Sequence, residues 1–175
     1  MTKIAIHGFG RIGRSTARVA LSRDLFVPAA ISDIQDPATL AELFAVDTNY
    51  GMWPEPVAFE DGKFLIGDKK IPYFNTAESI PDWRGLGVDV VIDCTGRATT
   101  RAGAQVHLDR GARMVLVSAN SKSLQDCDAL LLAGINLDSY DPREHRIVSM
   151  ASCTTNALAP VIKVIQENFG IRMGF

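Results

Sequence analysis

The stretch KIAIHGFGRIGRSTARVALS, residues 3–22, is the part of the sequence that best predicts the fold. Residues 3–6 form a short alternating run before Gly8, which is typical of a strand that enters a turn. From Arg11 to Ser22 the only helix breaker is Gly13, so we expect a helix over that range. The stretch therefore predicts a strand, a glycine turn and a helix in immediate succession.

The turn itself, GFGRIG at residues 8–13, fits the pattern GxGxxG through Gly8, Gly10 and Gly13. Glycines there allow a tight turn and close approach of a pyrophosphate, whose charge meets the free N–H groups of the next helix. A second predicted strand, residues 27–32, is followed by Asp33, 20 residues after Gly13, where an acid can bind the adenosine ribose. We predict a dinucleotide site. Local sequence alone also allows a turn that merely packs helix on strand, with Asp33 as a turn or cap residue.

Asp33 also bears on the choice of cofactor. A carboxylate at this position repels the 2′-phosphate of NADP, and the segment ISDIQD, residues 31–36, contains no arginine or lysine. The sequence therefore favours NAD over NADP.

The rest of the chain continues the alternation of strands and helices. Helices are expected at 37–46 and 100–108, and apolar strands at 88–94 and 114–117. Residues 57–74 differ, because Asp-Gly and Gly-Asp pairs divide them into short runs typical of antiparallel hairpins. We predict a Rossmann-type, doubly wound α/β fold with a mostly parallel sheet and a small antiparallel insertion at its edge. Ligands of such sheets bind beyond the carboxyl ends of the strands, here the loops at 8–13, 95–98 and 118–120.

Composition excludes several classes of partner. The 175 residues carry 18 basic and 20 acidic side chains, a net charge of −2, which predicts neither nucleic acid nor an anionic membrane as partner. We expect no membrane span, because no apolar run approaches the roughly 20 residues that a bilayer requires. The N-terminal residues show no secretory pattern. The three cysteines form no CxxC pair and no even set, which favours a reducing, cytoplasmic location.

One cysteine lies in a reactive context. SCTTN, residues 152–156, follows a predicted strand and precedes a helical stretch, so the free N–H groups and the helix dipole favour a thiolate at Cys153 and supply an oxyanion site. Local sequence leaves open that Cys153 is an ordinary small buried residue beside a polar cap. Pro160 also leaves open where the helix begins. For the three histidines, His7, His107 and His145, we expect surface or packing roles.

Three segments, in this order and spacing, carry a family resemblance: IHGFGRIGR at 6–14, CTGR at 94–97 and ASCTTNALAP at 151–160. They resemble the phosphorylating glyceraldehyde-3-phosphate dehydrogenases and their relatives, the erythrose-4-phosphate dehydrogenases. In such enzymes a cysteine thiolate attacks an aldehyde, the thiohemiacetal gives hydride to NAD, and inorganic phosphate cleaves the thioester. The resemblance implies a phosphorylated aldehyde substrate, and a homo-oligomer, usually a tetramer, for the full enzyme.

The resemblance also implies residue roles. Cys153 is then the nucleophile, its own N–H helps to hold the oxyanion, and Ser152 and Thr154 help to bind phosphate. For the cofactor, Arg11 and Ile12 offer backbone N–H groups to the pyrophosphate, Asp33 binds the adenosine ribose, and three residues line the path to the nicotinamide: Thr95, Gly96 and Ser118. No metal is implied.

The chain also departs from the family pattern. Four positions that affect cofactor geometry carry unusual residues: His7 for asparagine, Ile34 for proline, Ala98 for an aromatic residue and Asn120 for proline. We expect a cofactor domain at residues 1–151 and only the start of the catalytic domain at 152–175, without the family's activating histidine. The chain is then expected to be inactive by itself. A stand-alone, non-catalytic NAD-binding or assembly module, and a piece of an erythrose-4-phosphate dehydrogenase, are the alternatives.

Overall fold

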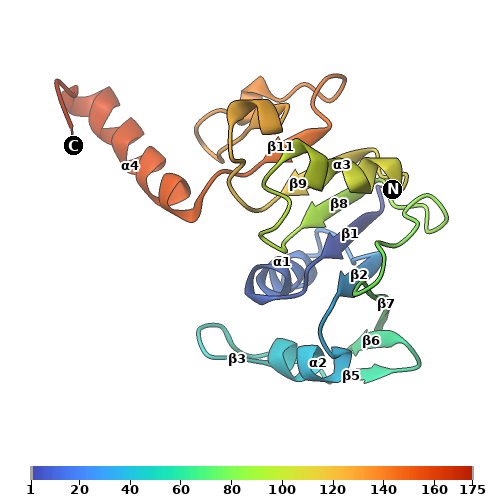
Figure 1. The fold of residues 1–175 in the computed structure, drawn as a ribbon. Coiled ribbons are helices and arrows are strands. Elements are labelled where there is room, and N and C mark those ends of the chain that lie inside the picture. The colour runs from blue at the N-terminus through green and yellow to red at the C-terminus, as the bar shows by residue number, and fades with distance from the viewer. Residues whose placement is uncertain (1, 175) are drawn as a thin grey trace.

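A computed structural model describes residues 2–174; the two end residues that complete the predicted domains, Met1 and Phe175, lie outside this range. The described residues form one nine-stranded sheet in the order β10-β11-β9-β8-β1-β2-β7-β6-β5 (Figure 1). Its strands are β1 (Ile4–His7), β2 (Ala30–Asp33), β5 (Val57–Glu60), β6 (Lys63–Ile66), β7 (Lys69–Asn75), β8 (Val90–Asp93), β9 (Met114–Val117), β10 (Ala129–Leu130) and β11 (Ile147–Ser149). A separate antiparallel pair joins β3 (Val46–Asp47) to β4 (Gly51–Met52).

Helices connect and cover these strands. The α-helices are α1 (Arg11–Ser22), α2 (Pro37–Ala45), α3 (Arg101–Asp109) and α4 (Cys153–Phe169), with short 3-10 turns η1 (Leu124–Asp126) and η2 (Leu137–Ser139). No helix of the described residues is both long enough and apolar enough to pass through a bilayer.

The sheet confirms the predicted Rossmann-type architecture. Strands β10 to β2 pair in parallel, and β7 joins β2 in parallel as well. The antiparallel insertion consists of β5, β6 and β7, which extend the sheet at one edge, as predicted. The second strand begins at Ala30 rather than at the expected Val27, and Pro28, which has no N–H to give to a ladder, explains the later start.

Strand register separates the two faces of the sheet. Ala5 pairs with both Ala30 and Val91, and Val115 aligns with Val91 and Ile147, so these five buried side chains share one face. Trp83 and α3 cover that face. The next residues along the strands lie on the opposite face, where Ile6 and Ile31 pack under α1 and α2. The sheet is thus covered on both faces around β1.

A buried arginine joins α1 to the end of α2. Arg18, only 8% exposed, donates from Nη2 to the carbonyls of Phe44 (2.5 Å), Ala45 (3.3 Å) and Gly51 (3.0 Å). Its guanidinium also lies 5.4 Å from the ring centroid of Phe44 and 5.6 Å from that of Trp53. The last carbonyls of a helix lack intrahelical partners and carry negative partial charge, so Arg18 stabilises the C-terminus of α2.

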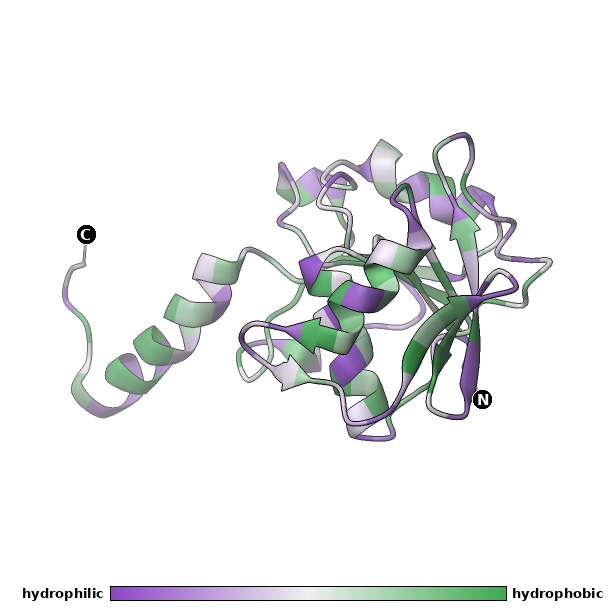
Figure 2. Ribbon diagram, turned by 90° about the horizontal axis from the view of Figure 1, so that it is seen from below, coloured by the Kyte–Doolittle hydropathy of each residue, from purple (hydrophilic) through white to green (hydrophobic). Residues whose placement is uncertain are grey.

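Helix α4 extends away from the sheet (Figure 1). It begins at Cys153, continues through Pro160 and ends at Phe169, before the C-cap residue Gly170, whose φ is 71°. The start that the sequence left open therefore lies at the cysteine itself. Many apolar side chains of α4 are exposed: Leu158, Val161, Ile162, Val164, Ile165 and Phe169. The hydropathy colouring shows hydrophobic segments along this helix (Figure 2).

Candidate functional site

The glycine turn links the end of β1 to the start of α1, and each of its glycines has a distinct environment. A Cβ on Gly8, whose φ is +88°, would lie 2.7 Å from the backbone nitrogen of Thr95. A Cβ on Gly13 would lie 2.0 Å from the carbonyl oxygen of Gly8, so α1 packs directly on the turn. A Cβ on Gly10 would meet nothing within 4 Å. The turn is therefore tightly packed at two glycines and open at the third, which faces solvent.

The first turn of α1 has backbone N–H groups that are available to bind an anion. Gly10 is its N-cap, no side chain accepts from the free N–H groups, and the first turn contains no acidic residue. Arg11 and Ile12 are both exposed there. Unpaired N–H groups at the positive end of a helix dipole are suited to a phosphate. These features fit a dinucleotide pyrophosphate at this position.

Asp33 at the end of β2, which the sequence predicts as a ribose ligand, also accepts three backbone hydrogen bonds. Its Oδ2 accepts from the backbone N–H of Phe9 (2.5 Å), and its Oδ1 accepts from those of Ile34 (2.7 Å) and Gln35 (2.9 Å). The carboxylate thus ties the glycine turn to the end of β2. A carboxylate has about four acceptor positions, so one stays available for a ribose hydroxyl.

A cleft of about 450 Å³ opens above the carboxyl ends of β1, β2 and β8. It contains four of the predicted cofactor residues: Gly8, Gly10, Asp33 and Thr95. The other five do not line it, namely Arg11, Ile12, Gly13, Gly96 and Ser118. His7, which the sequence places among the positions that affect cofactor geometry, also lines the cleft. The sequence did not predict five other polar lining residues: Gln35, Thr76, Asp93, Arg97 and His107. Arg97 was visible only as part of the motif CTGR, and nothing in the local sequence placed Gln35 or Thr76 in the cleft.

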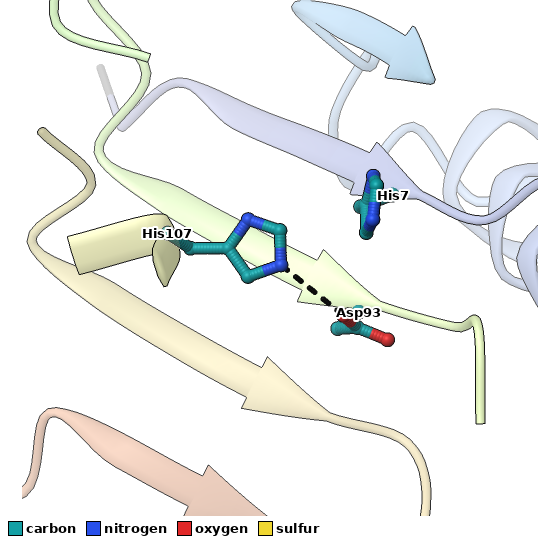
Figure 3. A group of neighbouring side chains, drawn as sticks. All are labelled: His7, Asp93 and His107. Atoms are coloured by element: carbon teal, nitrogen blue, oxygen red, sulfur yellow. Dashed lines mark hydrogen bonds and ion pairs between the residues drawn. The ribbon is translucent and has the colours of Figure 1, made fainter. Parts of the chain in front are cut away.

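Three of the lining residues, His7, Asp93 and His107, form a buried cluster (Figure 3). The indole N–H of Trp83 donates to Nδ1 of His107 (3.1 Å), and Nε2 of His107 lies 3.1 Å from Oδ2 of Asp93. Because an indole can only donate, Nδ1 of His107 accepts, and the ring proton lies on Nε2, which donates to Asp93. Nδ1 of His7 lies 2.8 Å from Oγ of the buried Ser32. The predicted packing roles of His7 and His107 agree with their burial.

Burial shifts the pKa values in this cluster. Burial and, to a smaller extent, the neighbouring His107 together lower the pKa of the His7 imidazole to about 4, against the opposing effects of Asp93 and Asp33. Burial alone raises the pKa of Asp93, but hydrogen bonds from His107 and Thr95 outweigh it and leave that pKa below its ordinary value. At neutral pH the cluster therefore holds one anionic carboxylate and a neutral His7.

The ligand atoms of His7, Asp93 and His107 lie within 4.8 Å of one another, which makes a metal site worth testing. A metal at Nε2 of His107 would require the ring proton on Nδ1, where it would face the N–H of Trp83. The donor set as hydrogen-bonded here therefore does not fit a metal ion.

Asp93 also sets the turn that follows β8. Its Oδ1 accepts from the backbone N–H (2.9 Å) and the hydroxyl (2.7 Å) of Thr95, and Oγ1 of Thr95 accepts from the N–H of Arg97 (3.1 Å). Gly96 in this turn has a φ of 71°, a conformation that favours glycine. The cluster thus holds the Thr95 turn against Gly8 at the mouth of the cleft.

Cys153 lines a second, smaller cavity of about 310 Å³. The cavity lies over Ile92 and Leu116 on the sheet face that carries α1, and its polar lining includes Thr16, Ser118 and Asn156. The structure thus brings Ser118 to Cys153 rather than to the adenosine side of the cleft. The thiol is free and exposed, at the first residue of α4.

The turn into α4 is held by its own polar side chains. Oγ of Ser152, the N-cap, accepts from the N–H of Thr155 (3.0 Å) and lies 2.9 Å from Oγ1 of Thr154. The amide of Asn156 donates to the carbonyl of Met150 (2.7 Å). Ala151, with a φ of 60° and 2% exposure, makes the sharp bend that presents the thiol.

The two cavities adjoin at Cys94. This residue lines the cofactor cleft, while Thr16 and Ser118, whose side chains lie near its thiol, line the cavity around Cys153. Burial raises the pKa of the Cys94 thiol to about 11, so it stays protonated at neutral pH. A ligand that extends from the glycine turn past Cys94 would approach Cys153.

A glycine turn between a strand and a helix, at the carboxyl edge of a parallel sheet and with an acid after the second strand, defines a Rossmann-type dinucleotide-binding domain. Residues 2–101 match the family model described as glyceraldehyde 3-phosphate dehydrogenase, NAD binding domain, and residues 152–175 match its C-terminal domain. The chain belongs to the glyceraldehyde-3-phosphate dehydrogenase family, and its cofactor is NAD.

Individual relatives agree with this assignment. The chain is 48% identical, over its whole length, to glyceraldehyde-3-phosphate dehydrogenase of Kitasatospora aureofaciens, and covers 52% of that protein. It is 41% identical over 98% of its length to the enzyme of Geobacillus stearothermophilus, of which it covers 51%. For glyceraldehyde-3-phosphate dehydrogenase 2 of Bacillus subtilis the identity is 37%, with 98% and 50% covered. The chain spans about half the length of the curated relatives it matches.

Proposed function

We propose that this chain is the NAD-binding part of a phosphorylating glyceraldehyde-3-phosphate dehydrogenase-like oxidoreductase. One observation carries the proposal: Cys153 begins α4 in a cavity that adjoins the cofactor cleft at Cys94. A thiol at a helix N-terminus is placed to act as a nucleophile on a carbonyl carbon.

In the proposed reaction the thiolate of Cys153 forms a bond to the carbonyl carbon of an aldehyde. The resulting oxyanion accepts from the backbone N–H of Cys153, one of the free N–H groups of the first turn of α4. NAD, when bound, supplies the hydride acceptor. Inorganic phosphate then displaces the thiolate from the thioester, which gives an acyl phosphate and restores the thiol site.

Ser152 and Thr154 are proposed to bind phosphate. Their hydroxyl oxygens lie 2.9 Å apart at the start of α4, and Ser152 is half-buried while Thr154 is exposed. A hydroxyl can exchange a hydrogen bond within such a pair for one to a phosphate oxygen. The glycine turn, Asp33, Thr95 and Gly96 are proposed to hold NAD, with Ser118 toward the nicotinamide end.

We further propose that residues 152–175 begin the catalytic domain. The match of this segment to the C-terminal family model and the exposed apolar side chains along α4 support this assignment. In the complete enzyme we propose a homo-oligomer, a tetramer by family, in the cytoplasm, with a phosphorylated aldehyde as substrate. Neither nucleic acid nor a membrane is proposed as a partner.

The 175-residue chain alone is proposed to turn over little or nothing. The cavity around Cys153 is lined by no histidine, so the thiol has no general base there. The test is NAD reduction by the purified chain with glyceraldehyde 3-phosphate and inorganic phosphate, with the Cys153→Ala variant as control. The expected rate equals that of the control. Phosphate-dependent reduction well above it would refute the proposed inactivity and indicate a base within this chain.

A non-catalytic NAD-binding or assembly module is the second candidate, and the same histidine-free cavity favours it for the chain as it stands. A piece of an erythrose-4-phosphate dehydrogenase is a third candidate, because the family resemblance includes those enzymes. A complex in which the chain binds NAD and restores activity to separately expressed catalytic-domain residues would decide for the enzyme over the module.

A further inference from the structure

A second cleft lies at the amino ends of the strands, at the edge of the sheet opposite to the cofactor cleft. Its lining includes Val90 and Met114, the first residues of β8 and β9, and Arg146, which directly precedes β11. Its volume is about 530 Å³, similar to that of the cofactor cleft, and the two clefts share no lining residue. This second cleft is referred to below as the amino-edge cleft.

The charged residues of the amino-edge cleft are all basic. Four arginines line it and no carboxylate does: Arg84, Arg113, Arg143 and Arg146. This concentration of positive charge is local, because the chain as a whole carries a net charge of −2. Within residues 2–174, Arg113 alone among the four makes an ion pair, at 3.7 Å to Asp89, and its side chain is 83% exposed. Asp141 and Asp128 lie near the cleft, but they accept from the backbone N–H groups of Arg143 and Arg146 (both 2.8 Å), and the guanidinium groups of Arg84, Arg143 and Arg146 make no ion pair among the described residues.

Backbone hydrogen bonds hold two side chains of the cleft in place, those of Arg146 and His145. Nε of Arg146 donates to the carbonyl of Arg113 (3.2 Å), which fixes the guanidinium while its outer nitrogens stay available. Nδ1 of His145 accepts from the N–H of Asp141 (3.0 Å), so the neutral ring carries its proton on Nε2. No acceptor for Nε2 of His145 occurs among the described residues.

The remaining lining gives the cleft an apolar wall. Val90, Leu108 and Met114 contribute side chains, and the hydroxyl of Tyr140 lies 3.3 Å from the sulfur of Met114. The ring of Tyr140 lies 5.9 Å from that of His145. A concave site with basic donors on an apolar wall is suited to a small molecule rather than to a flat partner surface.

We propose that the amino-edge cleft binds a small, multiply charged anion that carries phosphate groups. A planar guanidinium group can bind two phosphate oxygens with two parallel hydrogen bonds. The four arginines carry more positive charge than a ligand with a single carboxylate would balance, which favours a multiply charged anion. The volume lies within the range of small-molecule sites. A long polyanion is a poorer fit, because the acidic net charge of the chain repels phosphates outside the cleft.

The test is calorimetric titration of inorganic pyrophosphate into the 175-residue chain at low ionic strength. Pyrophosphate can also bind at the glycine turn. We therefore compare the dissociation constants of variants that all keep that turn unchanged, so that any difference comes from the amino-edge cleft. The double variant R84Q/R143Q removes two charges from the cleft. Its matched control, R23Q/R172Q, removes two exposed arginines elsewhere. Both doubles change the net charge equally.

We expect the dissociation constant of the cleft to rise at least about tenfold in R84Q/R143Q and to stay unchanged in the control. Added salt should weaken binding to the unmodified chain. Equal pyrophosphate binding by the unmodified chain and both doubles would overturn the proposal, and so would loss of binding in the control alone. Should R84Q/R143Q fold poorly, R143Q gives the same comparison, because the Arg143 side chain makes no hydrogen bond among the described residues.

Discussion

His7 places an imidazole in the lining of the cofactor cleft. It occupies the last position of β1, directly before Gly8, and its ring lies 4.8 Å from that of His107. Its hydrogen bond to Ser32 and its burial keep the imidazole neutral at physiological pH. His7 thus contributes a neutral imidazole to the lining of the cofactor cleft, and its burial disfavours protonation.

This burial predicts a pH dependence of stability. The unfolded chain binds a proton at His7 below about pH 6.5, whereas the folded chain does so only near pH 4. The free energy of unfolding should therefore fall as the pH is lowered from 6.5 to 4, by roughly 3 kcal/mol from this residue, and level off below. Urea unfolding across this range measures it.

The His7→Asn variant provides the comparison, because an amide can still reach Ser32 but does not titrate. Its stability should vary less between pH 6.5 and 4 than that of the unmodified chain. Asp93, whose pKa is lowered by hydrogen bonds in the folded chain, also begins to lose its stabilising contribution near the acid end of this range, but both proteins carry Asp93, so the comparison largely cancels that loss. Parallel stability curves for the two proteins would show that His7 is not the titrating group.

At the scale of elements, the structure depends on contacts between segments that are distant in sequence. Arg18 of α1 satisfies the end of α2, Asp33 of β2 holds the glycine turn, and Trp83 holds the α3 residue His107 against β8. None of these contacts follows a helical or strand period. Each replaces water around a buried polar group, so each should cost stability when one partner is removed.

Arg18 offers the sharpest test at this scale. The Arg18→Met variant keeps the apolar stem but leaves the carbonyls of Phe44 and Gly51 without their donor. We expect a loss of about 2–4 kcal/mol in the free energy of unfolding, measured with urea. Exposed Arg23→Met should change it by less than about 0.5 kcal/mol. If the two variants were equally stable, the cap on α2 would contribute nothing.

For the molecule as a whole, periodicity and turn chemistry predicted the parallel sheet, the edge insertion and the position of α1 because these depend on neighbours in sequence. The same holds for the GxGxxG turn, and of its residues Gly8 and Gly10 line the cleft together with Asp33. The cluster of His7, Asp93 and His107 was not found, because its members come from β1, β8 and α3 and meet only when the sheet forms. The sequence did not predict the arginine cluster of the amino-edge cleft for a related reason. These arginines come from separate segments that meet only at the amino ends of the parallel strands.

The central claim is that the glycine turn and Asp33 form a cleft for NAD, and calorimetric titration with NAD and NADP tests it most directly. The account predicts that NAD binds and that NADP binds at least about tenfold more weakly, since a 2′-phosphate would face the Asp33 carboxylate. Asp33→Asn should narrow the difference between the two cofactors. No binding of either cofactor, or equal binding of both by the unmodified chain, would contradict the account.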